Sequence, residues 1–143
     1  MLYGPMTHPG LLRALASAGH GTKILLADGN YPHTTGVNEY CELISLNLAP
    51  GLLTVDQVLE VLKHTIPIEK AEIMVPAPDA EPVEIPAHDG YKAALPDVEF
   101  GEISRWDYYD AARAPEVQIV VATGDQRLYA NLMLTIGVRQ PGE

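Results

Sequence analysis

The stretch from Gly19 to Pro32 constrains the fold most, because several structural signals follow one another within it. Its apolar run, Lys23 to Ala27, is bounded by turn-forming residues and predicts a short buried strand. Gly19 and Gly21 precede that strand, and glycine tolerates positive φ, so the pair predicts a helix end followed by a sharp turn. Asp28 follows the strand directly, at the carboxyl end where ligands bind in open α/β sheets.

A second chemical group, His20, precedes the same strand. His20 and Asp28 are therefore expected at opposite ends of a five-residue strand, which spans roughly 17 Å. If both serve one site, a loop must fold back or a second subunit must supply one of them.

Helical and strand patterns alternate along the chain, which predicts a layered α/β fold. A first helix is expected with Thr7 as its cap and Gly19 at its end, and others at the capping box 54–57, at 89–95 and at 104–112. The expected strands are 23–27, 43–48, 71–75, 98–103, 117–122 and 129–136. The proline-rich segment 76–86 is expected to be a connector, and 143 residues suffice for a single domain, 1–143.

The charge and cysteine content of the chain argue against several classes of binding partner and structure. A formal net charge of −10 opposes binding to nucleic acid or to an anionic membrane surface. The single cysteine, Cys41, excludes an internal disulfide and fits a reducing cytoplasm. We see neither a secretory signal pattern nor an apolar run near the ~18 residues of a membrane span.

A second polar cluster spans 123–131 and joins two apolar runs. Tyr129 and Asn131 stand two residues apart, so on a strand they would point to the same side. With His20 and Asp28, the chain offers an imidazole, a carboxylate, a phenol and an amide, which suit proton transfer on a neutral hydroxylated ligand. We find no Cys/His metal pattern, phosphate-binding glycine loop or nucleophile elbow.

These motifs together resemble one family. The matching residues are Gly19-His20-Gly21, Asp28, Pro32, Arg105, Tyr109, Thr123-Gly124-Asp125, Tyr129-Ala130-Asn131 and Gly137-Val138. In order and spacing they are similar to the RbsD/FucU family of sugar mutarotases, which comprises D-ribose pyranases and L-fucose mutarotases. Gly21 and the region of Arg105 resemble the fucose branch more closely, whereas the loop 29–40 departs from the family pattern.

The resemblance implies a single-domain α/β/α fold and an isomerase that interconverts the anomers of L-fucose or a related monosaccharide. It implies that His20 is the catalytic histidine, that Asp28, Arg105 and Asn131 bind substrate, and that Tyr129 binds substrate and transfers a proton. It also implies a homo-oligomer, commonly a decamer of two pentameric rings with sites at subunit interfaces. Neither a cofactor nor a metal is expected.

Simpler interpretations of the same residues remain open. His20 fits a helix C-terminus, Asp28 fits a turn, Tyr129 and Asn131 fit a strand start, and Arg105 fits a surface position. Three alternative functions also remain: a D-ribose pyranase, a non-enzymatic sugar-binding or transport-accessory protein, and a metal-dependent enzyme using His20, Asp28 and His33.

Overall fold

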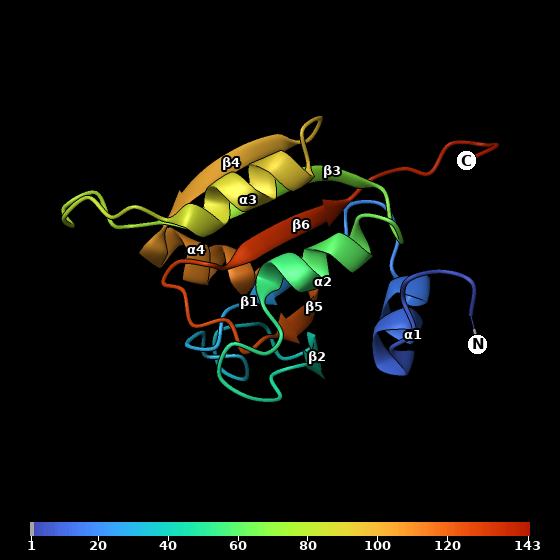
Figure 1. Cartoon of the computed structure of the whole chain (residues 1–143), viewed down its shortest axis with the longest axis horizontal. Coiled ribbons are helices and arrows are strands. Elements are labelled where there is room, and N and C mark those ends of the chain that lie inside the picture. Colours follow the sequence, from blue (N-terminus) through green and yellow to red (C-terminus); the bar gives the residue numbers. More distant parts are fainter. Residues whose placement is uncertain (1) are drawn as a thin grey trace.

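The structure is a computed structural model that describes residues 2–143. Along the described chain the elements are α1 (Pro9–Ser17), β1 (Lys23–Ala27), β2 (Glu42–Ser45), α2 (Val55–Leu62), β3 (Ile68–Val75), α3 (Pro86–Ala94), β4 (Glu99–Ser104), α4 (Arg105–Ala112), β5 (Val117–Ala122) and β6 (Leu132–Ile136). The strands form one six-stranded sheet in the order β2-β5-β1-β6-β3-β4 (Figure 1).

Strand direction determines where the site lies. β1 pairs in parallel with β5, β5 with β2, and β3 with β4, whereas β6 runs antiparallel to both β1 and β3. Five strands therefore end at one edge of the sheet, and β6 begins at that edge. The polar residues that follow β1 and precede β6 are brought together there.

Two apolar layers hold the sheet. Alternate residues of β1 face opposite sides: Leu26 packs into the cluster that contains Leu15 and Leu59, whereas Leu25 packs with Tyr108 of α4. Helices α1, α2 and α3 thus cover one face, and α4 with the loop 29–41 covers the other. This arrangement confirms the expected α/β/α layering.

Local sequence signals explain most element boundaries. The Thr54 hydroxyl accepts from the Gln57 amide while the Gln57 side chain accepts from the Thr54 amide, so the predicted capping box opens α2. The strands 23–27 and 117–122 have the predicted bounds. The connector 76–85 carries no regular element and projects from the body at the left of Figure 1.

The first helix differs from the prediction at both ends. Its N-cap is His8 rather than Thr7, because His8 Nδ1 accepts from the Leu11 amide at 3.1 Å. It ends at Ser17, with Ala18 rather than Gly19 as its C-cap, and the positive φ of the turn occurs at Gly21, where φ is 81°. The helix therefore ends earlier than expected, and the sharp turn before β1 is made at Gly21, the second glycine of the predicted pair.

Other boundaries shift as well. α3 starts at Pro86, three residues before the predicted helix, because proline fits the first turn. β2 is shorter than 43–48, β3 starts three residues early, and β4 is displaced by one residue. β6 begins only at Leu132, so Tyr129 and Asn131 precede it instead of sharing a strand face, and that prediction was wrong.

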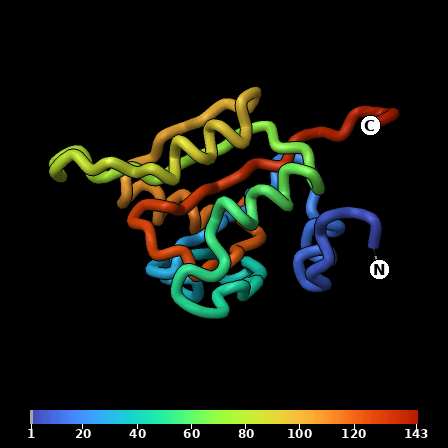
Figure 2. Tube along the Cα trace, viewed as in Figure 1, coloured from blue at the N-terminus to red at the C-terminus, as the bar shows by residue number. Residues whose placement is uncertain are grey.

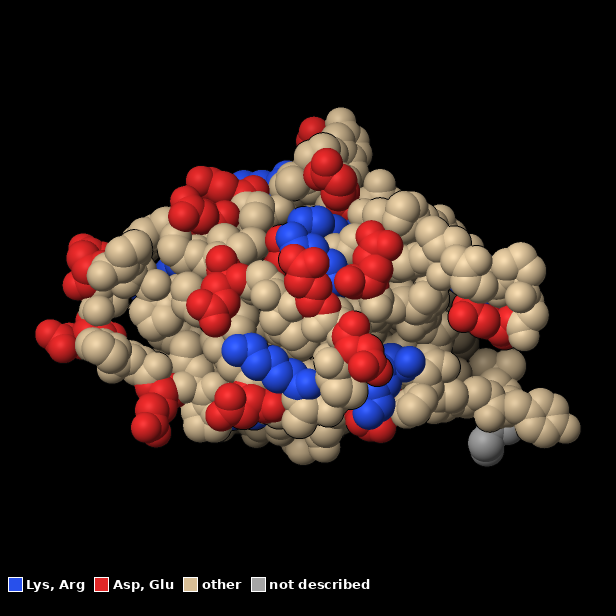
Figure 3. Space-filling view, turned by 90° about the horizontal axis from the view of Figure 1, so that it is seen from above, with Lys and Arg blue, Asp and Glu red and all other residues tan. Residues whose placement is uncertain are grey.

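The surface matches the acidic composition. In the view of Figure 3, Asp and Glu side chains are spread over the face, with a smaller set of Lys and Arg among them. Within residues 2–143, no helix is long and apolar enough to cross a membrane.

Candidate functional site

A pocket of about 190 Å³ opens where β1 ends and β6 begins. It is smaller than the ~300 Å³ at which pockets for drug-sized ligands start, so it suits a small ligand. Four residues predicted for the site line it together: Asp28, Arg105, Tyr129 and Asn131. The remaining lining residues are Asn30, Tyr31, Met74, Tyr109 and Leu128.

Asp28 and Asn131 form a reciprocal pair at the base of the pocket. The Asp28 amide donates to Asn131 Oδ1 at 2.8 Å, and Asn131 Nδ2 donates to Asp28 Oδ2 at 2.8 Å. Both residues are buried, with 4% and 3% of their surface exposed. Burial raises the pKa of the Asp28 carboxyl above its ordinary value, although the hydrogen bond from the Asn30 amide acts the other way.

The loop after Asp28 is fixed by two aromatic side chains. His33 Nε2 lies 2.8 Å from the Asp28 carbonyl oxygen, and because that oxygen only accepts, the proton lies on Nε2. The Tyr31 hydroxyl donates to the Gly36 carbonyl at 2.7 Å. These side chains thus hold the loop at the Asp28 carbonyl and at the Gly36 carbonyl.

Helix α4 contributes the opposite wall. The Arg105 guanidinium lies 4.8 Å from the centre of the Trp106 ring, and Tyr109 stacks on Tyr31 with ring centres 5.3 Å apart. These contacts join a cation and aromatic faces beside the pocket, which are groups that suit a neutral polyhydroxylated ligand.

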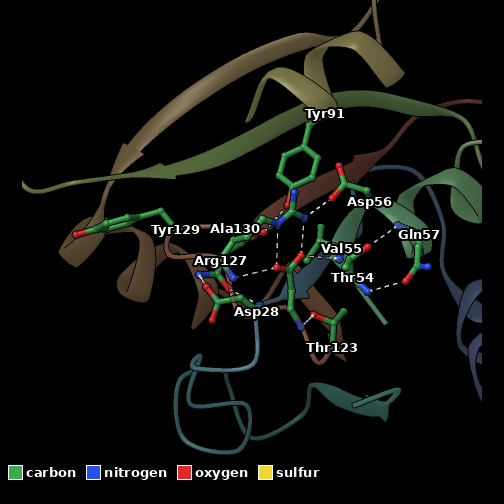
Figure 4. A network of polar contacts seen from close by, with 12 residues as sticks. Asp28, Thr54, Val55, Asp56, Gln57, Tyr91, Thr123, Arg127, Tyr129 and Ala130 are labelled. Carbon is green, nitrogen blue, oxygen red and sulfur yellow. Dashed lines mark hydrogen bonds and ion pairs between the residues drawn. The ribbon is translucent and has the colours of Figure 1, made fainter. Parts of the chain in front are cut away.

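The loop 123–131 carries residues of the pocket and also a network of polar contacts that holds the loop in place (Figure 4). Asp125 is almost completely buried, accepts from the Val55 amide at 3.0 Å and pairs with Arg127, which also contacts Asp56. Gly124 fits closely under the loop 46–53, since a Cβ there would lie 2.3 Å from the carbonyl oxygens of Ala49 and Leu52. This part of the polar cluster therefore fixes the loop that carries Tyr129.

His20 lies elsewhere. It lines a separate cavity of about 460 Å³ with residues that include Ile66, Gly137 and Val138, at the edge of the sheet where β6 ends. Figure 2 shows the two ends of β6 on opposite sides of the molecule, with the loop 123–131 at one end and the C-terminal segment at the other. The structure thus groups Asp28, Arg105, Tyr129 and Asn131 and does not bring His20 to them within one chain.

The sequence interpretation gave no site role to two residues placed here. Glu69, at the start of β3, has its Oε2 3.0 Å from His20 Nε2, and both side chains are partly exposed. Nothing in the local pattern predicts this pair, because 49 residues separate its members. Tyr109 belongs to the motif that follows Arg105, so its fixed spacing from Arg105 was the available signal.

The arrangement contains two separate groups of polar side chains that differ in chemistry. One contains a buried carboxyl, an amide, a phenol and a guanidinium, and the other contains an exposed imidazole held by a carboxylate. In the described part of the chain, no group of three or more His, Cys, Asp or Glu residues is placed to hold a metal ion.

A model of the RbsD / FucU transport protein family matches residues 1–139. The chain belongs to this family. The fucose mutarotase of Homo sapiens is 32% identical over 141 residues, which cover 91% of this chain and 88% of that protein. The D-ribose pyranase of Variovorax paradoxus is 34% identical over 136 residues, which cover 93% of this chain and 95% of that protein.

Solved structures of family members have the same fold. RbsD of Bacillus subtilis, complexed with D-ribose, superposes with a TM-score of 0.83 at 24% identity, covering 98% of this chain and 99% of that one. The fucose mutarotase of Streptococcus pneumoniae, in complex with L-fucose, gives the same TM-score and identity, covering 98% and 100%.

Proposed function

We propose that the chain is an isomerase, a monosaccharide mutarotase that interconverts the anomers of L-fucose or a related sugar. The observation that carries this proposal is the pocket around Asp28, where carboxyl, amide, phenol and guanidinium groups meet in a chain whose relatives include fucose mutarotases. Mutarotation opens a hemiacetal ring and recloses it on the other face. It needs proton transfers at two oxygens and no redox step.

The pocket residues are proposed to bind and orient the sugar. Asp28 accepts from a sugar hydroxyl, and Asn131 supports Asp28 through their paired hydrogen bonds. Arg105 donates to sugar oxygens from the wall, and the Tyr129 phenol can give or take a proton at an oxygen of the opening ring. As the anomeric hydroxyl loses its proton, the bond from C1 to the ring oxygen breaks and that oxygen gains one.

His20 is proposed as the main acid–base group. Its Nε2 faces Glu69, so Nδ1 is the ring nitrogen left for the sugar. A positioned group of this kind contributes about 10²–10⁴-fold to a rate. Because His20 lies at the other edge of its own sheet, a neighbouring subunit supplies it to each pocket.

An oligomer follows from this division of the site. A head-to-tail contact between one chain's His20 edge and the next chain's pocket repeats around a closed ring. We propose a decamer of two pentameric rings built from single-domain chains. A cytoplasmic location is part of the proposal and is supported by the single cysteine, which needs no oxidising compartment.

The experiment that tests the function is saturation-transfer NMR between sugar anomers, run on L-fucose, D-ribose, D-galactose and related sugars. We expect enhanced exchange with at least one sugar, and loss of that enhancement in His20→Ala with the unfolding temperature retained. Enhanced exchange of D-ribose alone would support D-ribose pyranase activity, which the Variovorax relative favours. Sugar contacts without enhanced exchange would instead support a non-enzymatic binding protein.

A further inference from the structure

Tyr129 has a backbone conformation that a tyrosine rarely adopts. Its φ is 60°, and it is the one residue other than glycine with positive φ in the described chain, 2–143. The Cβ of an L-residue crowds the backbone there, so this region is sparsely populated outside glycine, asparagine and aspartate. Such conformations persist where the surrounding structure over-determines them. Contacts around Tyr129 must therefore hold it.

Helix α3 provides those contacts. His88 Nε2 lies 3.0 Å from the Tyr129 carbonyl oxygen, and the Tyr91 hydroxyl donates to the next carbonyl, that of Ala130, at 2.8 Å. Residues 88 and 91 are three apart and so share one face of the helix. Figure 4 shows the Tyr91 side chain reaching to Ala130 while the Tyr129 ring points away from this network.

His88 is suited to donating this bond. Only 8% of its surface is exposed, and its ring lies 6.3 Å from the Tyr91 ring, centre to centre. Burial lowers the pKa of the imidazole, so it is neutral at neutral pH. A carbonyl oxygen only accepts, which places the proton on Nε2. A phenylalanine ring would fill the same space but could not donate a hydrogen bond, so the bond to the Tyr129 carbonyl is what the histidine contributes.

We propose that His88 is a positioning residue of the sugar site: by donating to the Tyr129 carbonyl it holds residue 129 in its left-handed conformation and so keeps the Tyr129 side chain at the pocket that Asp28 also lines. His88 does not line that pocket, so it acts through Tyr129. The inference rests on the proposed function for its kinetic consequence, and its structural consequence stands independently.

The test compares His88→Phe, which keeps the ring and removes the donor, with His88→Gln, whose amide can take the place of Nε2. His64→Gln, a change at an exposed histidine, is the matched control. Crystal structures of the intact assemblies read φ at residue 129. We expect His88→Phe to move Tyr129 out of the positive-φ region or turn its ring from the pocket, and His88→Gln to retain both.

Kinetics supply the second measurement. We expect His88→Phe to lower the exchange rate at saturating sugar about tenfold while the KM changes less, since a misplaced reacting group mainly costs rate. His88→Gln should recover most of that rate, and His64→Gln should keep all of it. Adding His88→Phe to Tyr129→Phe should cause little further loss, because both changes remove the same phenol function.

Several results would overturn the inference. An unchanged Tyr129 in His88→Phe would do so, as would a variant that loses only thermal stability and keeps its kinetic constants. If His88→Phe fails to fold, His88→Asn, whose amide is too short to reach the carbonyl, replaces it against His88→Gln. A wild-type protein without exchange on any sugar would overturn the proposed function, while the crystal structures would still decide whether His88 holds Tyr129.

Discussion

At the residue scale, Asn131 makes a paired contact with Asp28 that its sequence context does not predict. The amide was expected to meet a sugar hydroxyl directly, yet its Oδ1 and Nδ2 are both engaged by Asp28. We therefore expect Asn131 to contribute to sugar binding largely through the carboxyl that it orients. Removing the amide leaves a buried carboxyl with one fewer donor, in a place that water reaches poorly.

We predict that Asn131→Ala weakens sugar binding and lowers the free energy of unfolding by about 2 kcal/mol. Sugar titration and denaturant unfolding measure the two effects. Asn47→Ala, at an exposed asparagine in the neighbouring loop, is the control and should change stability little. A stable variant that still binds sugar as the wild type does would contradict this role for Asn131.

Asp125 gives a prediction about pH. Burial would raise the pKa of its carboxyl, but hydrogen bonds from Arg127 and the Val55 amide prevail and lower it. A carboxyl with a lowered folded-state pKa stabilises the fold fully above its ordinary pKa of about 3.9, and this stabilisation is lost as the pH falls through the lowered value.

We therefore expect Asp125→Asn to cost about 2 kcal/mol at pH 7, with the difference from wild type shrinking below about pH 4. Unfolding curves over a pH series measure this. Asp56→Asn, which removes the other partner of Arg127 at a more exposed position, should cost less than about 1 kcal/mol. Equal costs for the two variants at pH 7 would show that burial of Asp125 is not decisive.

At the element scale, the loop 46–53 packs against the turn after β5 through the close approach of its backbone to Gly124. A Cβ on Gly124 would meet two carbonyl oxygens of that loop, whereas a Cβ on Gly19 would have no neighbour within 4 Å. We predict that Gly124→Ala costs about 2 kcal/mol of stability and that Gly19→Ala costs nearly nothing. Thermal unfolding of both variants checks this, and an unaffected Gly124→Ala would show that the loop moves freely.

Elements were predictable wherever local pattern and tertiary structure agree. The strands 23–27 and 117–122 are apolar runs closed by turn residues, and their bounds are as predicted. The prediction of a strand starting at Tyr129 was wrong because residues distant in sequence bind the polar groups there. His88, which contacts the Tyr129 carbonyl, is 41 residues away, and Asp28 lies 103 residues from Asn131. No local periodicity contains such contacts.

In the candidate site too, local patterns predicted some residues, whereas contacts between distant residues could not be predicted. Strand ends pointed to Asp28, and the motif pattern pointed to Arg105, Tyr129 and Asn131, which the fold brings into one pocket. Glu69 was missed because its partner His20 is distant in sequence. The single antiparallel strand, which places the start of β6 beside the end of β1, was also beyond what alternation of helices and strands can predict.

At the scale of the whole molecule, the separation of His20 from the pocket predicts complementation between inactive chains. We expect His20→Ala and Asp28→Asn to be inactive alone. When they are unfolded together in equal amounts and refolded, about a quarter of the sites combine an intact His20 with a neighbour's intact Asp28. Exchange by NMR and light scattering on the mixture measure activity and assembly. A mixture that assembles but stays inactive would place both residues in a single-chain site.

The proposed division of the site between neighbouring chains, which places His20 and Asp28 at opposite edges of one sheet, also predicts that turnover depends on dilution. Under this proposal a chain without a neighbour would hold two incomplete halves of the site, so we expect the activity per milligram to fall steeply once the protein is diluted below the dissociation constant of its contacts. Synthesis of a little more protein would then yield disproportionately more catalysis. In such a protein, the rate of sugar interconversion measures the fraction of chains that are assembled.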